Sequence, residues 1–144
     1  MKRIAVAVCL SLLCGSARAQ APGDLNSVDV RYKACLVRAN GVTPSINVCN
    51  AASTAAADKL LNRLYDGWAD QLKHPAQGDA ADSAEILKRL VTAERAWIGF
   101  RDTSCNLEST SMLGGTGESN VYGDCLYRMT RQRVLDLKKV QADR

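Results

Sequence analysis

Residues 93–105, AERAWIGFRDTSC, place two acids, two arginines, a tryptophan and a cysteine in one helical pattern. On a helical wheel, Glu94 and Arg101 fall in the middle of an arc where apolar residues belong. We therefore interpret this stretch as the inside of a helical fold that buries two charged side chains. The apolar residues of the arc, which spans about 100°, are Leu87, Leu90, Trp97, Ile98 and Cys105.

Residues 121–142 predict a second amphipathic helix with a charge inside its apolar face. Arg133 lies among the apolar residues of this helix, and Asp136 lies at their margin. A charge that enters a core must be paired and hydrogen-bonded, or it costs several kcal/mol. Because Glu94 and Arg101 are about 10 Å apart along a helix, we expect their partners on other helices. The apolar residues around Arg133 are Tyr122, Leu126, Met129, Leu137 and Val140.

A long helix over residues 46–73 supplies candidate partners, because polar residues flank its apolar face. That face gathers Ile46, Ala57, Leu61, Leu64, Trp68 and Leu72. We predict one polar network where the three helices meet, which either fixes their register or lines a small site. Buried arginine–acid networks also occur outside active sites, so the sequence favours the structural role. The predicted members are Asp58, Asn62, Tyr65, Glu94, Arg101 and Arg133.

The first twenty residues, MKRIAVAVCLSLLCGSARAQ, have the three parts of a secretory signal. Lys2 and Arg3 precede an apolar run over 4–14, and Ala17-Arg18-Ala19 fits the rule for cleavage after Ala19. The run is too short to span a bilayer, which needs about 20 residues. The residues just ahead of Cys9 and Cys14 lack the small residue that lipid modification prefers. We expect residues 1–19 to be a signal peptide and the protein to be periplasmic or secreted, with no membrane contact after cleavage.

Cleavage also changes the charge of the chain. The full sequence has 19 Lys+Arg and 15 Asp+Glu, for a formal net charge of +4. Removing Lys2, Arg3 and Arg18 leaves a net charge of about +1, so the sequence gives no reason to expect nucleic acid as a partner. The remaining length suits one domain of ordinary size.

Four cysteines remain after cleavage, and an even number in an oxidising compartment predicts two disulfides. Three connectivities are open. We prefer Cys35–Cys49 and Cys105–Cys125, which close the short loops, and each bond would stabilise the fold by about 3 kcal/mol. The cysteines lack the close pairing of a zinc site, and the single histidine, His74, precedes Pro75 in a predicted turn. We expect no metal and no other cofactor.

The chain as a whole predicts an all-α fold, because no segment shows useful strand-like alternation. We expect a small antiparallel helical bundle of three longer helices plus a short N-terminal helix, with two disulfides. Thr43 or Ser45 is expected to cap the first long helix. The predicted segments are a flexible leader over 20–27, a helical domain over 28–144, helices over 28–39, 46–73, 82–108 and 121–142, a turn over 40–44 and a glycine-rich loop over 109–120.

Catalysis is not expected from these residues. No histidine lies near a nucleophile, and Ser104, Ser109 and Ser111 have no base partner in the sequence pattern. Glu94 and Asp102 lie about 80° apart on the wheel, which is poor geometry for a pair of catalytic carboxylates. We therefore predict that the protein is not an enzyme.

Five segments together resemble the LprI-type lysozyme inhibitor family of secreted bacterial proteins. They occur in the family's order and cover most of residues 35–140. Trp97, Asp102 and Thr130 belong to this shared pattern with family-like spacing, as do Arg101, Arg133 and two of the cysteines. The segments are INVCN (46–50), ADKLLNRLY (57–65), AERAWIGFRDTSC (93–105), LGG (113–115) and CLYRMTRQRVLDL (125–137).

The resemblance implies an all-helical, disulfide-linked periplasmic domain that inhibits lysozyme. It does not identify the contact residues. The chain departs from the family pattern at Glu94, where a glutamine is expected, and at Asp136, where a glutamate is more usual. The alternative is a non-catalytic periplasmic interaction protein that binds another envelope enzyme or a toxin.

The loop over 109–120 is our candidate for the partner contact. A lysozyme works with two carboxylates in a cleft, and an inhibitor must block that cleft. The loop would be pinned at its base by a Cys105–Cys125 bond, while glycines such as Gly114 and Gly115 allow it to bend. A plain connector between two helices is the alternative. Glu108, Glu118 and Asp124 would form an acidic patch beside the loop.

Overall fold

The computed structural model describes residues 24–76 and 79–143. Over these residues the chain is helical apart from short connections, so the prediction of an all-α fold is confirmed. The elements are α1 (Leu25–Ala39), α2 (Thr43–Lys73), α3 (Ala80–Ser109), a 3₁₀ turn η1 (Thr110–Met112) and α4 (Glu118–Ala142).

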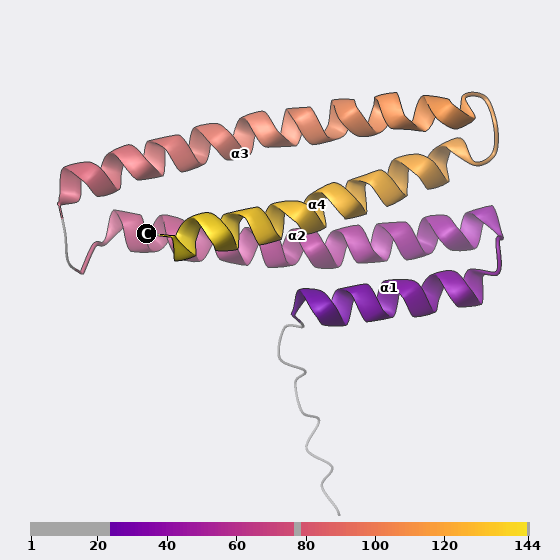
Figure 1. Cartoon of the computed structure of the whole chain (residues 1–144), viewed down its shortest axis with the longest axis horizontal. Coiled ribbons are helices and arrows are strands. Elements are labelled where there is room, and N and C mark those ends of the chain that lie inside the picture. The colour runs from indigo at the N-terminus through magenta and orange to yellow at the C-terminus, as the bar shows by residue number, and fades with distance from the viewer. Residues whose placement is uncertain (1–23, 77–78, 144) are drawn as a thin grey trace, which may run out of the picture.

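The helices form two antiparallel hairpins, α1–α2 and α3–α4, that lie against each other (Figure 1). Helix α4 packs along both α2 and α3, and its contact with α2 is the most extensive between any two elements of the described residues. The turns of both hairpins lie at one end of the molecule, and the α2–α3 connection lies at the other. The arrangement confirms the predicted antiparallel bundle.

Helix α1 begins three residues earlier than the sequence pattern predicted. The side chain of Asp24 accepts a hydrogen bond from the backbone N–H of Ser27 at 2.8 Å, which caps the first turn. The predicted leader over 20–27 therefore overlaps the helix in its last residues. The signal peptide and its cleavage site lie outside the described residues.

The start of α2 also corrects the prediction. Neither Thr43 nor Ser45 caps this helix, because both are already helical and the cap position is Val42, which makes no side-chain hydrogen bond. Pro44 occupies the first turn, where a missing N–H costs nothing. The preceding turn is tight, with φ of 47° at Asn40, the left-handed residue that ends α1.

Two clusters of buried side chains form the core, and α4 contributes to both. The buried face of α4 is rotated toward α2 relative to the predicted face. Tyr127, Thr130 and Val134 are buried, whereas Val140 is 51% exposed. Ile98 on α3 is likewise 47% exposed. The rotation follows from packing, since α4 is covered by α2 as well as by α3.

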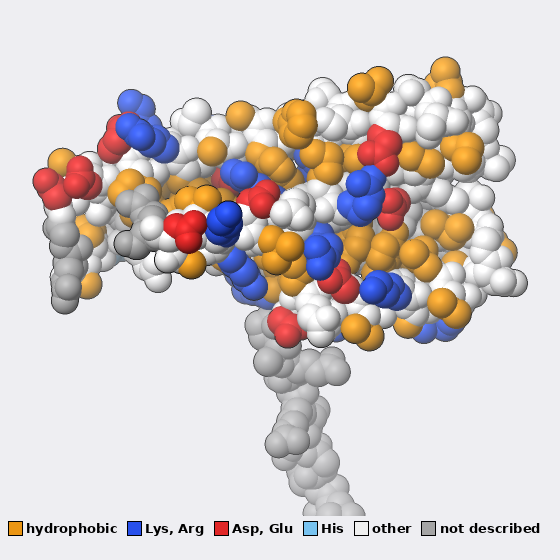
Figure 2. Space-filling model, in the orientation of Figure 1, with side chains coloured by type: hydrophobic (Ala, Val, Ile, Leu, Met, Phe, Trp, Pro, Cys, Tyr) orange, Lys and Arg blue, Asp and Glu red, His pale blue; other side chains and the backbone are white. Residues whose placement is uncertain are grey.

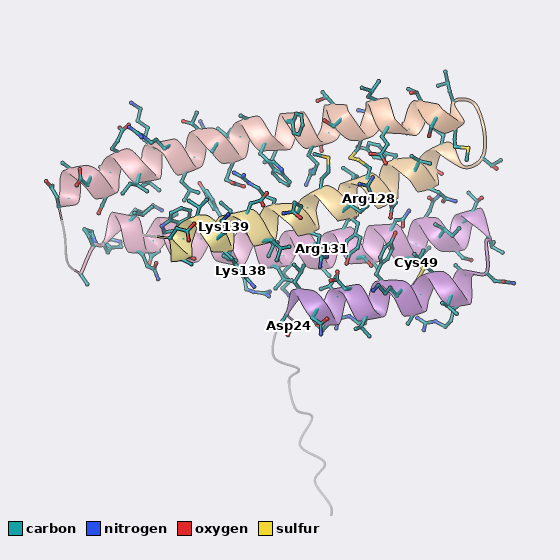
Figure 3. All side chains as sticks on the ribbon, in the orientation of Figure 1. Asp24, Cys49, Arg128, Arg131, Lys138 and Lys139 are labelled. Carbon is teal, nitrogen blue, oxygen red and sulfur yellow. A yellow bond between two sulfur atoms is a disulfide. The ribbon has the colours of Figure 1, made fainter. Side chains whose placement is uncertain are left out.

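Both predicted disulfides are present among the described residues. Cys35 of α1 bonds to Cys49 of α2, and Cys105 of α3 bonds to Cys125 of α4. Each bond therefore joins the two helices of one hairpin, and each lies near the turn of that hairpin, as the label on Cys49 marks for the first (Figure 3).

Candidate functional site

The most buried ion pair among the described residues joins α3 to α4. Arg133 donates from Nε and Nη2 to Oε1 of Glu94, at 2.9 and 2.5 Å. Glu94 is only 8% exposed, so little of its side chain is in contact with water. The pairing satisfies the requirement that a carboxylate in an apolar arc be paired and hydrogen-bonded.

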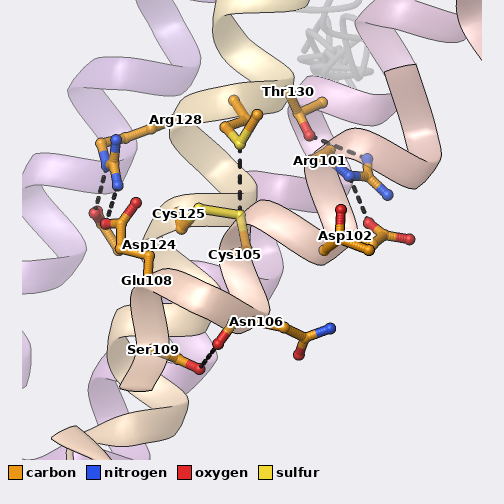
Figure 4. The surroundings of a disulfide bond; sticks show 12 residues. Arg101, Asp102, Cys105, Asn106, Glu108, Ser109, Asp124, Cys125, Arg128 and Thr130 are labelled. Atoms are coloured by element: carbon orange, nitrogen blue, oxygen red, sulfur yellow. Dashed lines mark hydrogen bonds and ion pairs between the residues drawn. A yellow bond between two sulfur atoms is a disulfide. The ribbon is translucent and has the colours of Figure 1, made fainter. Parts of the chain in front are cut away.

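Arg101 connects α3 to the two other long helices. Its Nη1 atom lies 3.4 Å from Oδ1 of Asp58 on α2 and 3.2 Å from Oγ1 of the fully buried Thr130 on α4. Its Nε atom donates to Asp102 at 2.9 Å (Figure 4). One guanidinium thus ties together α2, α3 and α4.

The ring of Trp97 lies beside both arginines. The Cζ atoms of Arg101 and Arg133 are 5.0 and 5.7 Å from its centroid, within the range of cation–π attraction. The structure therefore brings together most of the predicted network and three further residues of the family-like pattern. We call this cluster the central network: Asp58, Glu94, Trp97, Arg101, Asp102, Thr130 and Arg133.

Two predicted members do not join the central network. Asn62 is exposed, and Tyr65 packs against the apolar core. Neither side chain hydrogen-bonds to any described residue. The reason is the orientation of α2: Leu61 and Trp68 face the core, which turns Asn62 toward solvent and leaves the ring of Tyr65 at the apolar border.

The predicted loop over 109–120 is much shorter in the structure. Turn η1 extends α3, and α4 begins at Glu118, so that only residues 113–117 lie outside helices. Gly114 has φ of 72° and donates its N–H to Oε2 of Glu118 at 3.0 Å. Gly115 donates to the backbone of Met112 at 2.8 Å. The connection is a compact turn rather than a long loop.

The three acids near this turn do not form a free acidic patch. Glu118 is engaged by Gly114 within the turn. Glu108 and Asp124 both accept hydrogen bonds from Arg128 (Figure 4). Asp124 also accepts from the hydroxyl of Tyr32 at 2.8 Å.

The end of the bundle that carries both turns is apolar and almost uncharged. Residues 39–57 and 109–117 contain no Asp, Glu, Lys or Arg. Hydrophobic side chains stand at its surface, among few charged ones (Figure 2). We call residues 37–48 and 107–117 the stapled end. Its large apolar side chains, each 53% to 79% exposed, are Val37, Val42, Val48, Leu107, Met112 and Leu113.

Comparison with known proteins identifies a family and a relative that this chain resembles. The model of the family described as Lysozyme inhibitor LprI matches residues 35–137. The chain belongs to the LprI family. An uncharacterized protein of Rhizobium meliloti (strain 1021) is 37% identical over 98 residues, which cover 66% of this chain and 70% of that protein. No solved structure is significantly similar.

The residues matched by the LprI model include both disulfides and the central network. The match begins at residue 35, so it leaves out the α1 residues of a second polar cluster. In that cluster Arg131 of α4 pairs with Asp29 of α1 at 2.7 Å. Asp29 also accepts from the hydroxyl of Tyr127 at 2.5 Å. The hydroxyl of Tyr32 shares its one proton between Oδ1 of Asn50, at 2.7 Å, and Oδ1 of Asp124. We call this cluster the outer network: Asp29, Tyr32, Asn50, Asp124, Tyr127, Arg128 and Arg131.

The outer network shifts the acidity of its members. The hydrogen bond from Arg131 lowers the pKa of Asp29, against the opposing effect of burial. Burial, together with the hydrogen bonds to Asp124 and Asp29, raises the pKa values of Tyr32 and Tyr127 respectively. Asp29 is thus held ionised and both tyrosines are held neutral, which suits a structural contact.

Sequence reasoning missed the outer network. Its signal was the apolar spacing of Leu25, Val28 and Tyr32, which becomes visible once α1 is known to begin at Leu25.

Across residues 24–76 and 79–143, no helix is long and apolar enough to cross a membrane. The same residues contain no cluster of His, Cys, Asp and Glu that could hold a metal ion.

Proposed function

We propose that this LprI-family chain is an exported, non-catalytic protein that inhibits a lysozyme and thereby protects the cell wall. The family match over residues 35–137 carries the proposal, because the family is described by that activity. The two disulfides support an oxidising location outside the cytoplasm.

We assign the lysozyme contact to the stapled end. Interface centres are poor in charged residues and rich in apolar ones, which matches the six exposed apolar side chains there. A lysozyme cleft contains two carboxylates. A surface with few charged side chains can enter such a cleft without burying many unpaired charges, which would be costly.

The two disulfides favour binding at the stapled end because they fix its conformation before a lysozyme binds. A contact surface that is already ordered loses less conformational entropy on binding. The central network has a different role in this proposal: it holds α2, α3 and α4 in register and touches no partner. Its arginines are 14% and 19% exposed, which leaves little guanidinium surface for recognition.

The test is lysis of a peptidoglycan suspension by c-type, g-type and i-type lysozymes, with and without the oxidised chain from residue 20 onward. We expect dose-dependent inhibition of one lysozyme class. The same protein after reduction of its disulfides should inhibit less, because the stapled end is no longer fixed. Absence of inhibition of all three classes at a large molar excess of folded protein would contradict the proposal.

A further inference from the structure

The outer side of α3 is exposed, uncharged and partly apolar. Helix α3 lies at the edge of the bundle, and no described element covers the side that is turned away from α2 and α4 (Figure 1). Residues three or four apart share one side of a helix. Phe100 and Leu107 on this side are 63% and 72% exposed. We call this surface, which extends over about 22 Å of helix, the α3 face: Thr92, Ala96, Gly99, Phe100, Thr103 and Leu107.

The hydroxyl groups of the α3 face are already hydrogen-bonded to the helix itself. Thr92 Oγ1 donates to the backbone oxygen of Lys88 at 2.9 Å. Thr103 Oγ1 donates to the backbone oxygen of Gly99 at 2.7 Å. Loss of water from the α3 face therefore leaves no hydroxyl donor unpaired, which is the usual cost of burying a polar group. The face is suited to contact with another protein surface.

Nothing within the described subunit requires a glycine at position 99. No atom lies within 4 Å of a Cβ atom built on Gly99, and the residue is inside a regular helix. A glycine in a helix interior destabilises the helix relative to alanine, but it allows another group to approach the backbone closely. The exposed ring of Phe100 lies next to it in the sequence. A second copy of α3 would bring such a ring against Gly99.

The charged flank of the α3 face is complementary to itself. Arg95 and Asp102 lie on the same flank, seven residues or two turns apart. Arg95 is exposed and forms no ion pair within residues 24–76 and 79–143. The side chain of Asp102 is 44% exposed, and its one bonded atom is Oδ1, which accepts from Arg101. Two identical helices that pack antiparallel about a two-fold axis near Gly99 place each Arg95 beside Asp102 of the partner subunit.

We propose that the chain forms a weak dimer in which the α3 faces of two copies pack antiparallel. A two-fold interface requires a patch that is complementary to itself, and the Arg95–Asp102 flank meets this requirement. Phe100 of each copy packs over Gly99 of the other. One pair of helices makes a small interface, so the association is weak. The inference does not rest on the proposed function, because the two stapled ends lie at opposite ends of the dimer.

The mass of the protein in solution tests the inference. The oxidised chain from residue 20 onward is studied by sedimentation equilibrium between about 5 and 500 µM, where weak interfaces associate. We expect the mass to rise from that of a monomer toward that of a dimer. Phe100→Glu should raise the dissociation constant at least about tenfold, because the interface would then bury carboxylates without partners. Val30→Glu is the matched control, since Val30 of α1 is 59% exposed, and it should dimerise like wild type.

Two further substitutions test the close approach and the charge pairing. Gly99→Gln places a side chain where the partner's Phe100 packs and should weaken the dimer. Gly67→Gln, at an equally open helical glycine of α2, should not. Arg95→Glu should weaken the dimer by about twofold to tenfold, because it faces Asp102 of the partner subunit. All these positions are exposed, so circular dichroism should show that each variant is folded.

Three results would overturn the inference. The first is a monomer at every concentration up to the highest one tested. The second is a wild-type dissociation constant in Phe100→Glu, Gly99→Gln or Arg95→Glu. The third is a loss of dimer in Val30→Glu or Gly67→Gln as large as that in the α3 variants, which would place the interface elsewhere.

Discussion

The central and outer networks attach the same helix, α4, to its neighbours by different chemistry. In the central network, Arg133 and Arg101 meet carboxylates at positions where the helical pattern calls for apolar residues. In the outer network, tyrosine hydroxyls share the contacts with two partly exposed ion pairs, Asp29–Arg131 and Asp124–Arg128. The side chain of Glu94 is 10% exposed, whereas that of Asp29 is 19% exposed.

This difference shows how the position of a charge on a helix relates to its energetic role. A buried carboxylate is stabilised by its ion-pair partner instead of by water. Loss of that partner therefore leaves an unpaired buried charge, which destabilises the fold. A carboxylate nearer the surface that also accepts a hydrogen bond from a tyrosine can still bind water and the tyrosine when its arginine partner is lost. We therefore expect substitutions in the central network to cost more than substitutions in the outer one.

The largest effect is expected from Arg133→Ala. The substitution removes the residue that donates both hydrogen bonds to Glu94 and leaves a buried carboxylate unpaired. The free energy of unfolding should fall by about 3 to 5 kcal/mol. Urea unfolding followed by circular dichroism measures it.

Two further variants serve as comparisons for the stability of Arg133→Ala. Glu94→Gln installs the residue that the family pattern leads us to expect, and it should cost less because its amide oxygen can still accept the hydrogen bonds of Arg133. Asn62→Ala changes an exposed residue outside both networks and should stay within about 0.5 kcal/mol of wild type. If Arg133→Ala were as stable as Asn62→Ala, the central network would not have the role that we assign to it.

Gly123→Ala should have an intermediate effect through the outer network. A Cβ atom at this position would lie 2.9 Å from both Cβ and Nδ2 of Asn50. Asn50 would have to move, which disturbs its hydrogen bonds to Tyr32 and to the backbone of Asn120. We expect a loss of about 1 to 3 kcal/mol, typical of overpacking.

Gly99→Ala is the matched control for this substitution, since it also lies within a helix. No atom lies within 4 Å of a Cβ built there. The variant should gain up to about 1 kcal/mol from helix propensity. A loss of stability in Gly99→Ala equal to that in Gly123→Ala would show that the contact with Asn50 is not the cause.

Asp29→Asn should have the smallest effect on stability, about 1 kcal/mol near neutral pH, and a distinctive pH dependence. The pKa of Asp29 is lowered in the folded state below the ordinary value of an aspartate, chiefly by the hydrogen bond from Arg131. Its contribution is therefore complete above that value and is lost as the pH falls through the lower folded-state pKa. The difference in unfolding free energy between wild type and Asp29→Asn should shrink as the solution is acidified below pH of about 4. A difference that grows with acidification would contradict this assignment.

The sequence was sufficient for features that depend on local pattern. Helical periodicity predicted the all-α bundle, and loop length predicted both disulfide pairings. The central network was predictable because Glu94, Arg101 and Arg133 interrupt apolar arcs. A charge in an apolar arc must have a partner, and this physical rule holds without knowledge of the tertiary structure.

The features that were missed depend on how the helices pack. Whether Asn62 faces Arg101 or solvent is decided by the rotation of α2, which a wheel centred on one helix does not fix. The outer network forms where α1 packs against α4, and these segments are about a hundred residues apart in the sequence. Their contact cannot be predicted from the local pattern of either helix. The turn before α4 is short because the Glu118 side chain holds Gly114 and thus lets the helix begin early.

The claim that the stapled end is the functional surface is tested most directly by one paired measurement. Leu113→Glu introduces a charge at the tip of that end, and Val140→Glu introduces the same charge at an exposed valine outside it. Both variants should melt close to wild type, since both positions are exposed. In the lysozyme inhibition assay, Leu113→Glu should lose most of its inhibition while Val140→Glu retains it. Full inhibition by Leu113→Glu would contradict the account.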